Sequence, residues 1–226
     1  MAQRRHHYEQ AFERYLRAER VPYVAVDEAK KALMPEGSPL TVRAAADPGH
    51  ESALKSFDFV LYGASDSGRS GDGRASNLLV EVKGRRVVGS ARGAPGALRS
   101  PRLESWVTLE DVRSLRTWAS LFGPEFLAAF VFLYWCEDQP PDALFQEVFE
   151  HRGRWYAVRA VTVERYAAAM KTRSPRWGTV HVPGPVFERI SQPLLPVVAG
   201  VRRLAEGFTG TSPFADPGPE WPAMER

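Results

Sequence analysis

The sequence is short of several features on which common classes of protein depend. Its 226 residues include a single cysteine, Cys136, which excludes an internal disulfide and any zinc site built from several cysteines. Its longest apolar run, residues 126–135, falls well below the roughly 20 residues that a membrane-spanning helix needs. The first residues are charged rather than apolar, so we expect no secretory signal and a cytoplasmic protein that does not enter a membrane.

The sequence also lacks the motifs of a phosphate-binding loop and of a serine or cysteine hydrolase. The glycine-rich segment 63–76 is not followed by Gly-Lys-Ser/Thr and opens no predicted helix, so we interpret it as a surface loop rather than a phosphate-binding loop. The sequence has no nucleophile elbow and no Cys/His pairing, and Cys136 ends an apolar run where a small buried residue is the commoner explanation. Serine and cysteine hydrolase chemistry therefore finds no support.

Composition and length are those of an ordinary folded domain. The chain is 44% hydrophobic and 25% charged, and it is long enough to bury a substantial core. The net charge of +3 and the pI of about 9.1 are weak evidence of phosphate binding, because total charge says less than its distribution. We predict one domain over residues 1–206, followed by a Pro/Gly-rich tail over 207–226 that is disordered or loosely docked.

Two apolar segments carry charged residues at positions where a strand would bury them. Residues 55–62 contain Asp58, and residues 78–86 contain Glu81 and Lys83. Side chains two apart on a strand point to the same face, so Glu81 and Lys83 are predicted to project together. Burying these charges is costly unless they pair or hold a metal, and a site for magnesium-assisted phosphodiester cleavage would account for them. On a half-exposed strand, the alternative is a surface ion pair that contributes little.

The stretch 7–16 has the spacing of an amphipathic helix, with two acids beside its apolar face. Glu9 and Glu13 are four residues apart and are therefore neighbours on the helix surface. For Glu9 we expect a solvated position, and the pair would be useful to a site if one of the two acids pointed toward a cation. The residues of the apolar face are Tyr8, Phe12, Tyr15 and Leu16.

Hydrophobic periodicity and turn residues place the remaining elements. Thr108 and Asp111 open a helix with a capping-box pattern, and Gly123 followed by proline ends it. The predicted strands are 21–26, 54–62, 77–88 and 126–135, with a hairpin formed by 143–150 and 154–161. Shorter helices are predicted over 27–33, over 163–171 and within 194–206, whereas 35–50 and 174–178 are expected to be irregular.

Basic residues follow the Glu-x-Lys segment without an intervening acid. From Lys83 to Arg102 no Asp or Glu occurs. A basic segment leaving this strand suits contact with a phosphate backbone, and a solvated arginine-rich loop is the alternative. The candidate nucleic-acid-binding residues are Arg85, Arg86, Arg92, Arg99 and Arg102.

The order helix, strand, Asp-bearing strand, Glu-x-Lys strand, helix, strand resembles the core of the PD-(D/E)xK nuclease superfamily, in particular its archaeal Holliday-junction-resolvase-like branch. The resemblance covers residues 8–135. It implies an α/β fold with a restriction-endonuclease-like αβββαβ core and a mixed central sheet, to which 143–206 would add a C-terminal β-hairpin and helix extension. Residues 7–13 also resemble the pattern that names the HYExAFE family, a match that implies no activity.

The superfamily resemblance assigns roles to four residues. It implies that Asp58 and Glu81 bind a divalent metal, Mg²⁺ or Mn²⁺, and that Lys83 orients or stabilises the attacking water. Glu13 aligns best with the acidic residue that many members carry on the first helix. One departure is Phe57, which stands where the motif has proline before Asp58.

The first functional hypothesis is a metal-dependent nuclease that acts on DNA and is structure-selective or repair-related, since no sequence-recognition module is evident. The alternative is a non-catalytic nucleic-acid-binding or protein-interaction module that keeps a nuclease-like fold. An RNA-processing enzyme would share the same site. Resolvase-like members are often dimers, so the resemblance allows a homodimer, although no segment of the sequence identifies an interface.

Overall fold

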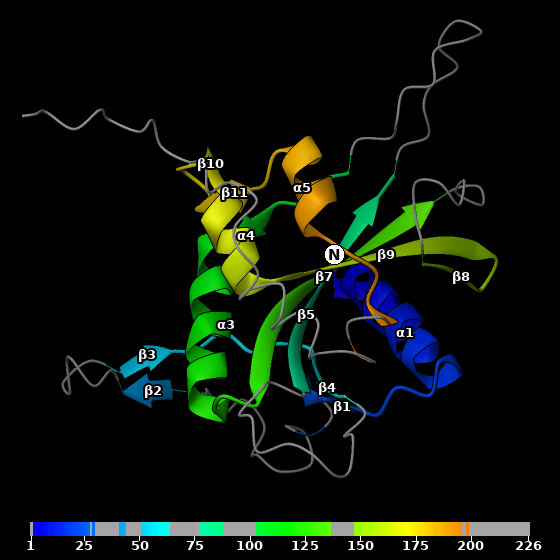
Figure 1. Ribbon diagram of the computed structural model, residues 1–226, viewed down its shortest axis with the longest axis horizontal. Coiled ribbons are helices and arrows are strands. Elements are labelled where there is room, and N and C mark those ends of the chain that lie inside the picture. Colours follow the sequence, from blue (N-terminus) through cyan, green and yellow to red (C-terminus); the bar gives the residue numbers. More distant parts are fainter. Residues whose placement is uncertain are drawn as a thin grey trace, which may run out of the picture.

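A mixed β-sheet lies at the centre of the molecule. The computed structural model of the chain describes residues 2–27, 29, 41–43, 51–63, 77–87, 103–136, 147–195 and 198 (Figure 1). The described strands of this sheet are, in spatial order, β1 (Tyr23–Ala25), β4 (Phe59–Tyr62), β5 (Asn77–Arg86), β7 (Phe126–Cys136), β9 (Arg154–Thr162) and β8 (Val148–His151).

The directions in which the strands of this sheet pair are those expected for the predicted core. Strands β1, β4 and β5 form an antiparallel meander, whereas β7 lies parallel to β5. A parallel neighbour requires a crossover, and α3 (Leu109–Phe122) lies in that connection. With α1 (Ala2–Ala18) at the start, the order of the helices and the strands of this sheet up to β7 is αβββαβ, so the predicted α/β core with a mixed central sheet is confirmed.

The hairpin β8–β9 extends this sheet beyond β7, because β9 pairs antiparallel with both β7 and β8. Arg152 and Gly153 join its strands with φ values of 53° and 69°, the left-handed conformation that tight hairpin turns require. The predicted hairpin is thus present, followed by the predicted short helix α4 (Val163–Ala169).

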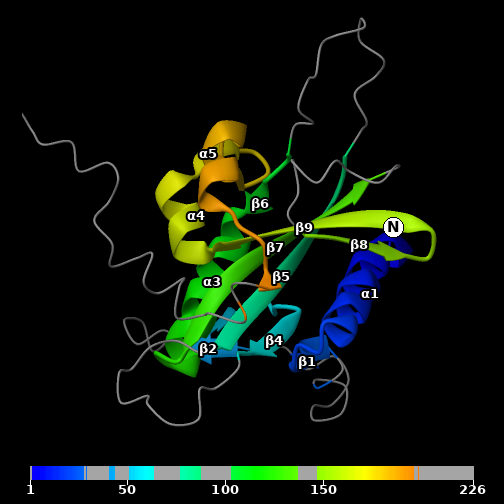
Figure 2. The same ribbon diagram turned by 45° about the vertical axis from the view of Figure 1, so that its right-hand side comes forward.

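Helices cover both faces of the sheet. Figure 2 shows α1 on one side, with α3 and α4 on the other. The buried apolar residues form two clusters, one on each face of the sheet, because successive side chains of β5 point to opposite faces. Leu78 and Val80 belong to the cluster on the α1 side, and Leu79 belongs to the cluster on the α3 side. None of the described helices is long and apolar enough to span a membrane.

The start of α3 is defined by its own side chains. Thr108 is the N-cap and accepts a hydrogen bond from the backbone N–H of Asp111, whose carboxylate accepts one from the N–H of Thr108. This reciprocal arrangement is the predicted capping box. The helix ends at Gly123, whose φ of 102° favours glycine.

Several short elements differ from the sequence predictions. Strand β4 begins at Phe59 rather than at residue 54, and β2 (Thr41–Arg43) lies in a segment expected to be irregular. Helix α5 (Gly184–Ile190) was not predicted. The other unpredicted elements are β3 (Glu51–Ala53), β6 (Val107–Thr108), β10 (Lys171–Ser174) and β11 (Thr179–His181). Strands of two to four residues are too short to show a periodicity, and β6 forms only because it pairs with the distant β11.

Part of the predicted chain lies outside the described residues. This holds for most of the helices expected over 27–33 and within 194–206, for the first residues of the segment 143–150, and for the tail 207–226. The proposed division into a domain and a tail therefore stays a prediction.

Gly84 on β5 allows α1 to approach the sheet. A Cβ atom at this position would overlap the ring of Tyr8 on α1. We expect Gly84→Ala to destabilise the protein by about 1–3 kcal/mol, the usual cost of overpacking. The measurement is urea-induced unfolding followed by circular dichroism.

The matched control for Gly84 is Gly184→Ala, because a Cβ at Gly184 meets no atom within 4 Å. Adding Tyr8→Ala to Gly84→Ala should recover part of the lost stability, since the two positions are in contact. Equal destabilisation by the two glycine substitutions would contradict the packing argument.

Candidate active site

Charged side chains gather on the face of β5 that α3 covers. Lys83 Nζ donates to Glu81 Oε1 at 2.7 Å, and Glu81 is only 8% exposed. The prediction that these two side chains project together is confirmed. Asp58 joins them because its backbone N–H bonds to Val80 O, and its Oδ2 accepts a hydrogen bond from the N–H of Val82 at 2.6 Å.

Asp111 is a fourth member of the cluster, which sequence reasoning missed. Its Oδ2 lies 2.9 Å from Lys83 Nζ, while its Oδ1 binds Lys55. Lys55 Nζ in turn lies 3.7 Å from Glu81 Oε1. Asp111 therefore closes a network of two lysines and two acids. In the sequence its place in the capping box already accounted for it, and no signal there pointed to a second role.

The pKa of Asp111 reflects this network. Burial alone would raise the pKa of this carboxyl group, but Lys83 and Lys55 outweigh burial and lower it to about 2. The same contacts raise the pKa of Lys55 against the opposing effect of burial. Asp111 thus stays ionised and holds Lys83 in place beside Glu81.

Asp58 has the opposite electrostatic environment. Burial and the nearby carboxylate of Glu81 raise its pKa well above the usual range, although the N–H of Val82 and the charge of Lys83 oppose the shift. Glu9 raises it further. Two or more acids held together with too little positive charge are typical of a functional site rather than a structural ion pair.

The first helix contributes Glu9 to this environment. Glu9, which we expected at a solvated position, is partly buried and acts on Asp58. Glu13 instead accepts hydrogen bonds from Arg17 at 2.6 Å and from the hydroxyl of Tyr23 at 2.8 Å. The two acids flank the same apolar face, and the packing of α1 on β5 decides which of them reaches the cluster.

The residues present fit a divalent cation of the magnesium type. Within the described part of the chain, no group of three or more His, Cys, Asp or Glu is arranged to hold a metal. Magnesium does not require one, because it commonly binds one or two carboxylates and takes its other oxygen ligands from water and substrate phosphate. The hydrogen bonds described above engage Oδ2 of Asp58 and Oε1 of Glu81, which leaves a second oxygen on each carboxylate.

The predicted nucleic-acid-binding arginines do not form one patch. Arg85 lies on the same face of β5 as Lys83, donates to the carbonyl of Trp106 and stacks over its ring at 4.1 Å. Burial lowers the pKa of Arg85. Arg86 lies over Trp135 at 5.0 Å, on the opposite face of the strand. The other three candidates, Arg92, Arg99 and Arg102, lie outside the described residues.

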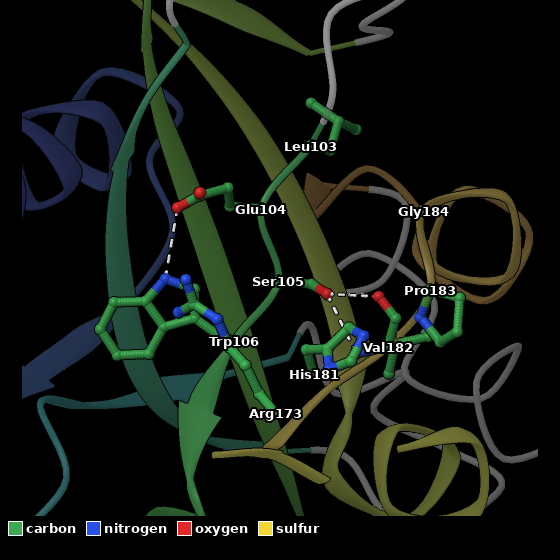
Figure 3. Close-up of a pocket in the computed structure, with 9 residues that line it drawn as sticks. All are labelled: Leu103, Glu104, Ser105, Trp106, Arg173, His181, Val182, Pro183 and Gly184. Atoms are coloured by element: carbon green, nitrogen blue, oxygen red, sulfur yellow. Dashed lines mark hydrogen bonds between the residues drawn. The ribbon is translucent and has the colours of Figure 1, made fainter. Parts of the chain in front are cut away.

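A cavity of about 300 Å³ opens beside Trp106 (Figure 3). Arg173 from β10 lies 4.9 Å from the Trp106 ring, whose Nε1 donates to Glu104. His181 also lines the cavity, and its Nδ1 is buried without a hydrogen-bond partner among the described residues. The complete lining is Leu103, Glu104, Ser105, Trp106, Arg173, His181, Val182, Pro183 and Gly184.

The order of elements and the sheet topology define the class of protein: a mixed α/β fold with an αβββαβ core around a mixed central sheet. Hjc, a Holliday junction resolvase from the archaeal hyperthermophile Archaeoglobus fulgidus, is similar over 85% of this chain and 98% of its own, with 14% identity and a TM-score of 0.43. A similarity of this size carries no argument about activity or ligands. No family model and no curated protein matches the chain, so the resemblance to the HYExAFE pattern has no support beyond residues 7–13.

Proposed function

We propose that the protein is a metal-dependent nuclease that hydrolyses phosphodiester bonds in DNA. The observation that carries the proposal is that Asp58, Glu81 and Lys83 meet along β5, with the pKa of Asp58 raised by burial and by the carboxylate of Glu81. The αβββαβ core that positions these residues agrees with the PD-(D/E)xK resemblance of the sequence.

Each residue of the cluster has a role that its contacts support. Asp58 and Glu81 would hold Mg²⁺ or Mn²⁺, which supplies Lewis-acid activation of water and offsets charge on the scissile phosphate. Lys83 offers a fixed positive charge to the attacking water or to the phosphate oxygens. Asp111 is a positioning residue, because it holds Lys83 Nζ at 2.9 Å while keeping its own negative charge.

Glu9 is the acid on the first helix that the structure favours for this site. It contributes negative potential at Asp58, whereas Glu13 is engaged by Arg17 and Tyr23. Its role would be to bind water at the metal or to increase the attraction for the cation. The earlier assignment of Glu13 stays a prediction, and Glu9→Gln compared with Glu13→Gln in the assay below distinguishes the two.

The first test is cleavage of a panel of nucleic acids with Mg²⁺ or Mn²⁺. The panel contains duplex, single-stranded, flapped and four-way DNA together with structured RNA. We expect wild-type protein to cut at least one DNA, and Lys83→Ala to lower the rate by about 10²- to 10³-fold, the usual effect of removing one group that stabilises transition-state charge.

The matched control for Lys83→Ala is Arg116→Ala. Arg116 also pairs with an acid, Glu164 at 2.6 Å, but both side chains are about half exposed and lie away from the cluster. Its loss should leave the cleavage rate unchanged, because such surface pairs contribute little. If wild-type protein cuts no member of the panel and Lys83→Ala binds nucleic acid as wild type does, the non-catalytic binding module is the better description.

A further inference from the structure

The β10–β11 hairpin presents an exposed aromatic ring among basic side chains. Trp177, at the turn of this hairpin, is 72% exposed, and the guanidinium of Arg176 lies 5.5 Å from its ring centre. Lys171 and Arg173 on β10 are also exposed. Between Glu164 and Glu188 the sequence contains no acid, so the whole hairpin carries one sign of charge. Charge of this kind is complementary to a phosphate backbone.

The hairpin is held directly against the start of α3, the helix that carries Asp111. The backbone N–H of Leu109, the first residue of α3, donates to Gly178 O at 2.7 Å. Strand β11 also pairs with β6, through Thr179 with Thr108 and Val180 with Val107. Trp177 precedes Gly178, whose carbonyl is bound by the first residue of α3, and Asp111 in the first turn of α3 contacts Lys83. Backbone contacts therefore fix the position of Trp177 relative to the active-site cluster.

A row of stacked side chains connects the cluster with the hairpin along a second route. Arg85 follows Lys83 by two positions on the same face of β5 and stacks on Trp106. Arg173 of the hairpin contacts the same ring, as Figure 3 shows. Basic and aromatic side chains therefore run from β5 to Arg173 on β10, the strand that leads into the turn at Trp177. Alternating positive charge and aromatic faces is the arrangement that binds single-stranded nucleic acid.

We propose that the β10–β11 hairpin is a nucleic-acid contact in which Trp177 stacks on an unpaired base next to the cleaved strand. This inference rests on the proposed function, because it takes nucleic acid as the ligand. The substrate class would be DNA with an unpaired segment. Arg173 and Arg176 contact the flanking phosphates. A base inside an intact duplex is already stacked on both sides, so a blunt duplex offers the Trp177 contact only at its two terminal base pairs.

The test is equilibrium binding without metal, in EDTA, so that it does not depend on cleavage. The probe is a fluorescein-labelled oligonucleotide of mixed sequence, presented as a single strand, as a blunt duplex and as a duplex with an unpaired flap. We expect Trp177→Ala to weaken binding of the single strand and the flap by about 5- to 100-fold, the range seen for loss of one base–aromatic stack. Binding of the blunt duplex should change much less.

Two further variants separate stacking from charge. Trp177→Phe keeps an aromatic face and should bind within about threefold of wild type, while losing the quenching of tryptophan emission that stacking on a base produces. Arg176→Gln should reduce the slope of log K against log salt on the single strand by about 0.7. The control is Leu121→Ala, which removes another exposed apolar side chain, 55% exposed and at the far end of α3, and should change none of these values.

The outcomes of the two experiments are independent. Trp177-dependent binding of unpaired DNA supports the hairpin proposal even if the cleavage panel shows no nuclease activity. Equal weakening on all three probes, or no weakening on any of them, overturns it. Trp177-dependent binding to phosphatidylcholine vesicles containing phosphatidylserine, without Trp177-dependent binding to DNA, also overturns it, because the hairpin would then contact an anionic membrane surface.

Discussion

Replacing Asp58 with asparagine is expected to raise the melting temperature of the metal-free protein by a few degrees, while lowering metal-dependent cleavage by about 10³-fold or more. The stability gain follows from removing a buried carboxylate that Glu81 and Glu9 repel. Asparagine retains an oxygen that can accept the hydrogen bond now made by the N–H of Val82. The loss of activity follows because the metal would lose a charged ligand, and with it several kcal/mol of transition-state stabilisation.

The stability effect of Asp58→Asn should depend on pH with a definite sign. The pKa of Asp58 is higher in the folded protein than in the unfolded chain, so the folded state loses stability as pH rises through that folded pKa. Asparagine cannot ionise and removes this loss. The difference in melting temperature between variant and wild type, measured by calorimetry in EDTA, should therefore be larger at about pH 7.5 than at about pH 4.

Metal binding gives an independent readout for the same variant. Added Mn²⁺ should raise the melting temperature of wild-type protein by mass action and should raise that of Asp58→Asn much less. Asp27→Asn is the matched control, because Asp27 is an exposed acid after β1. A variant that is less stable than wild type at every pH and still responds fully to Mn²⁺ would contradict the assignment of Asp58 as a ligand.

Replacing Asp111 with asparagine is expected to destabilise the protein by about 2–5 kcal/mol. The substitution keeps the shape of the side chain and an acceptor for the N–H of Thr108, but it removes one of the two carboxylates that pair with both Lys83 and Lys55, the other being Glu81. At about 2–4 °C per kcal/mol for a chain of this size, the melting temperature should fall by about 4–20 °C. Cleavage should fall by about 10- to 100-fold, because Lys83 loses the contact that positions it.

The pH dependence of this variant has the opposite sign to that of Asp58→Asn. The pKa of Asp111 is lowered to about 2 in the folded protein, so its contribution is complete above the unfolded value and is lost as pH falls toward 2. The stability difference between wild type and Asp111→Asn should therefore be full at neutral pH and shrink between about pH 4 and pH 2. Acid denaturation followed by tryptophan fluorescence measures it.

The control for Asp111 is Glu164→Gln, which removes an acid from the exposed pair with Arg116. Its effect should stay within about 0.5 kcal/mol at every pH. If Asp111→Asn unfolds at the same temperature as wild type, the charge of Asp111 is not what holds the two lysines, and its role would be limited to the helix cap.

The arrangement of the core could be predicted from local patterns in the sequence. Period-two alternation placed Glu81 and Lys83 on one face of a strand, and the run 126–135 identified the central strand that became β7. Thr108, Asp111 and Gly123 marked the ends of α3 through their capping chemistry. These features depend on residues within a few positions of one another, which is why a single sequence reveals them.

The membership of the charged cluster depended on contacts between distant segments. Lys55 and Asp111 are 56 residues apart, and in the sequence the helix cap already accounted for Asp111, so nothing local indicated their contact. Glu9 and Glu13 flank the same helix face, so the packing of α1 on the sheet, with Tyr8 against Gly84 as one of its contacts, determines that Glu9 acts on Asp58.

The position of the β10–β11 hairpin also depends on contacts between distant segments, although its turn could be expected from the sequence. Residues 174–178 were expected from the sequence to be irregular, and 175–178 form a turn after the end of β10. Their place beside the cluster comes from β11 pairing with β6, two residues of strand that the sequence gives no reason to expect. Strand alternation and helix caps depend on sterics and hydrogen bonds between residues a few positions apart. The charged cluster and the β10–β11 hairpin beside it depend instead on which faces of distant helices and strands pack together when the core is buried.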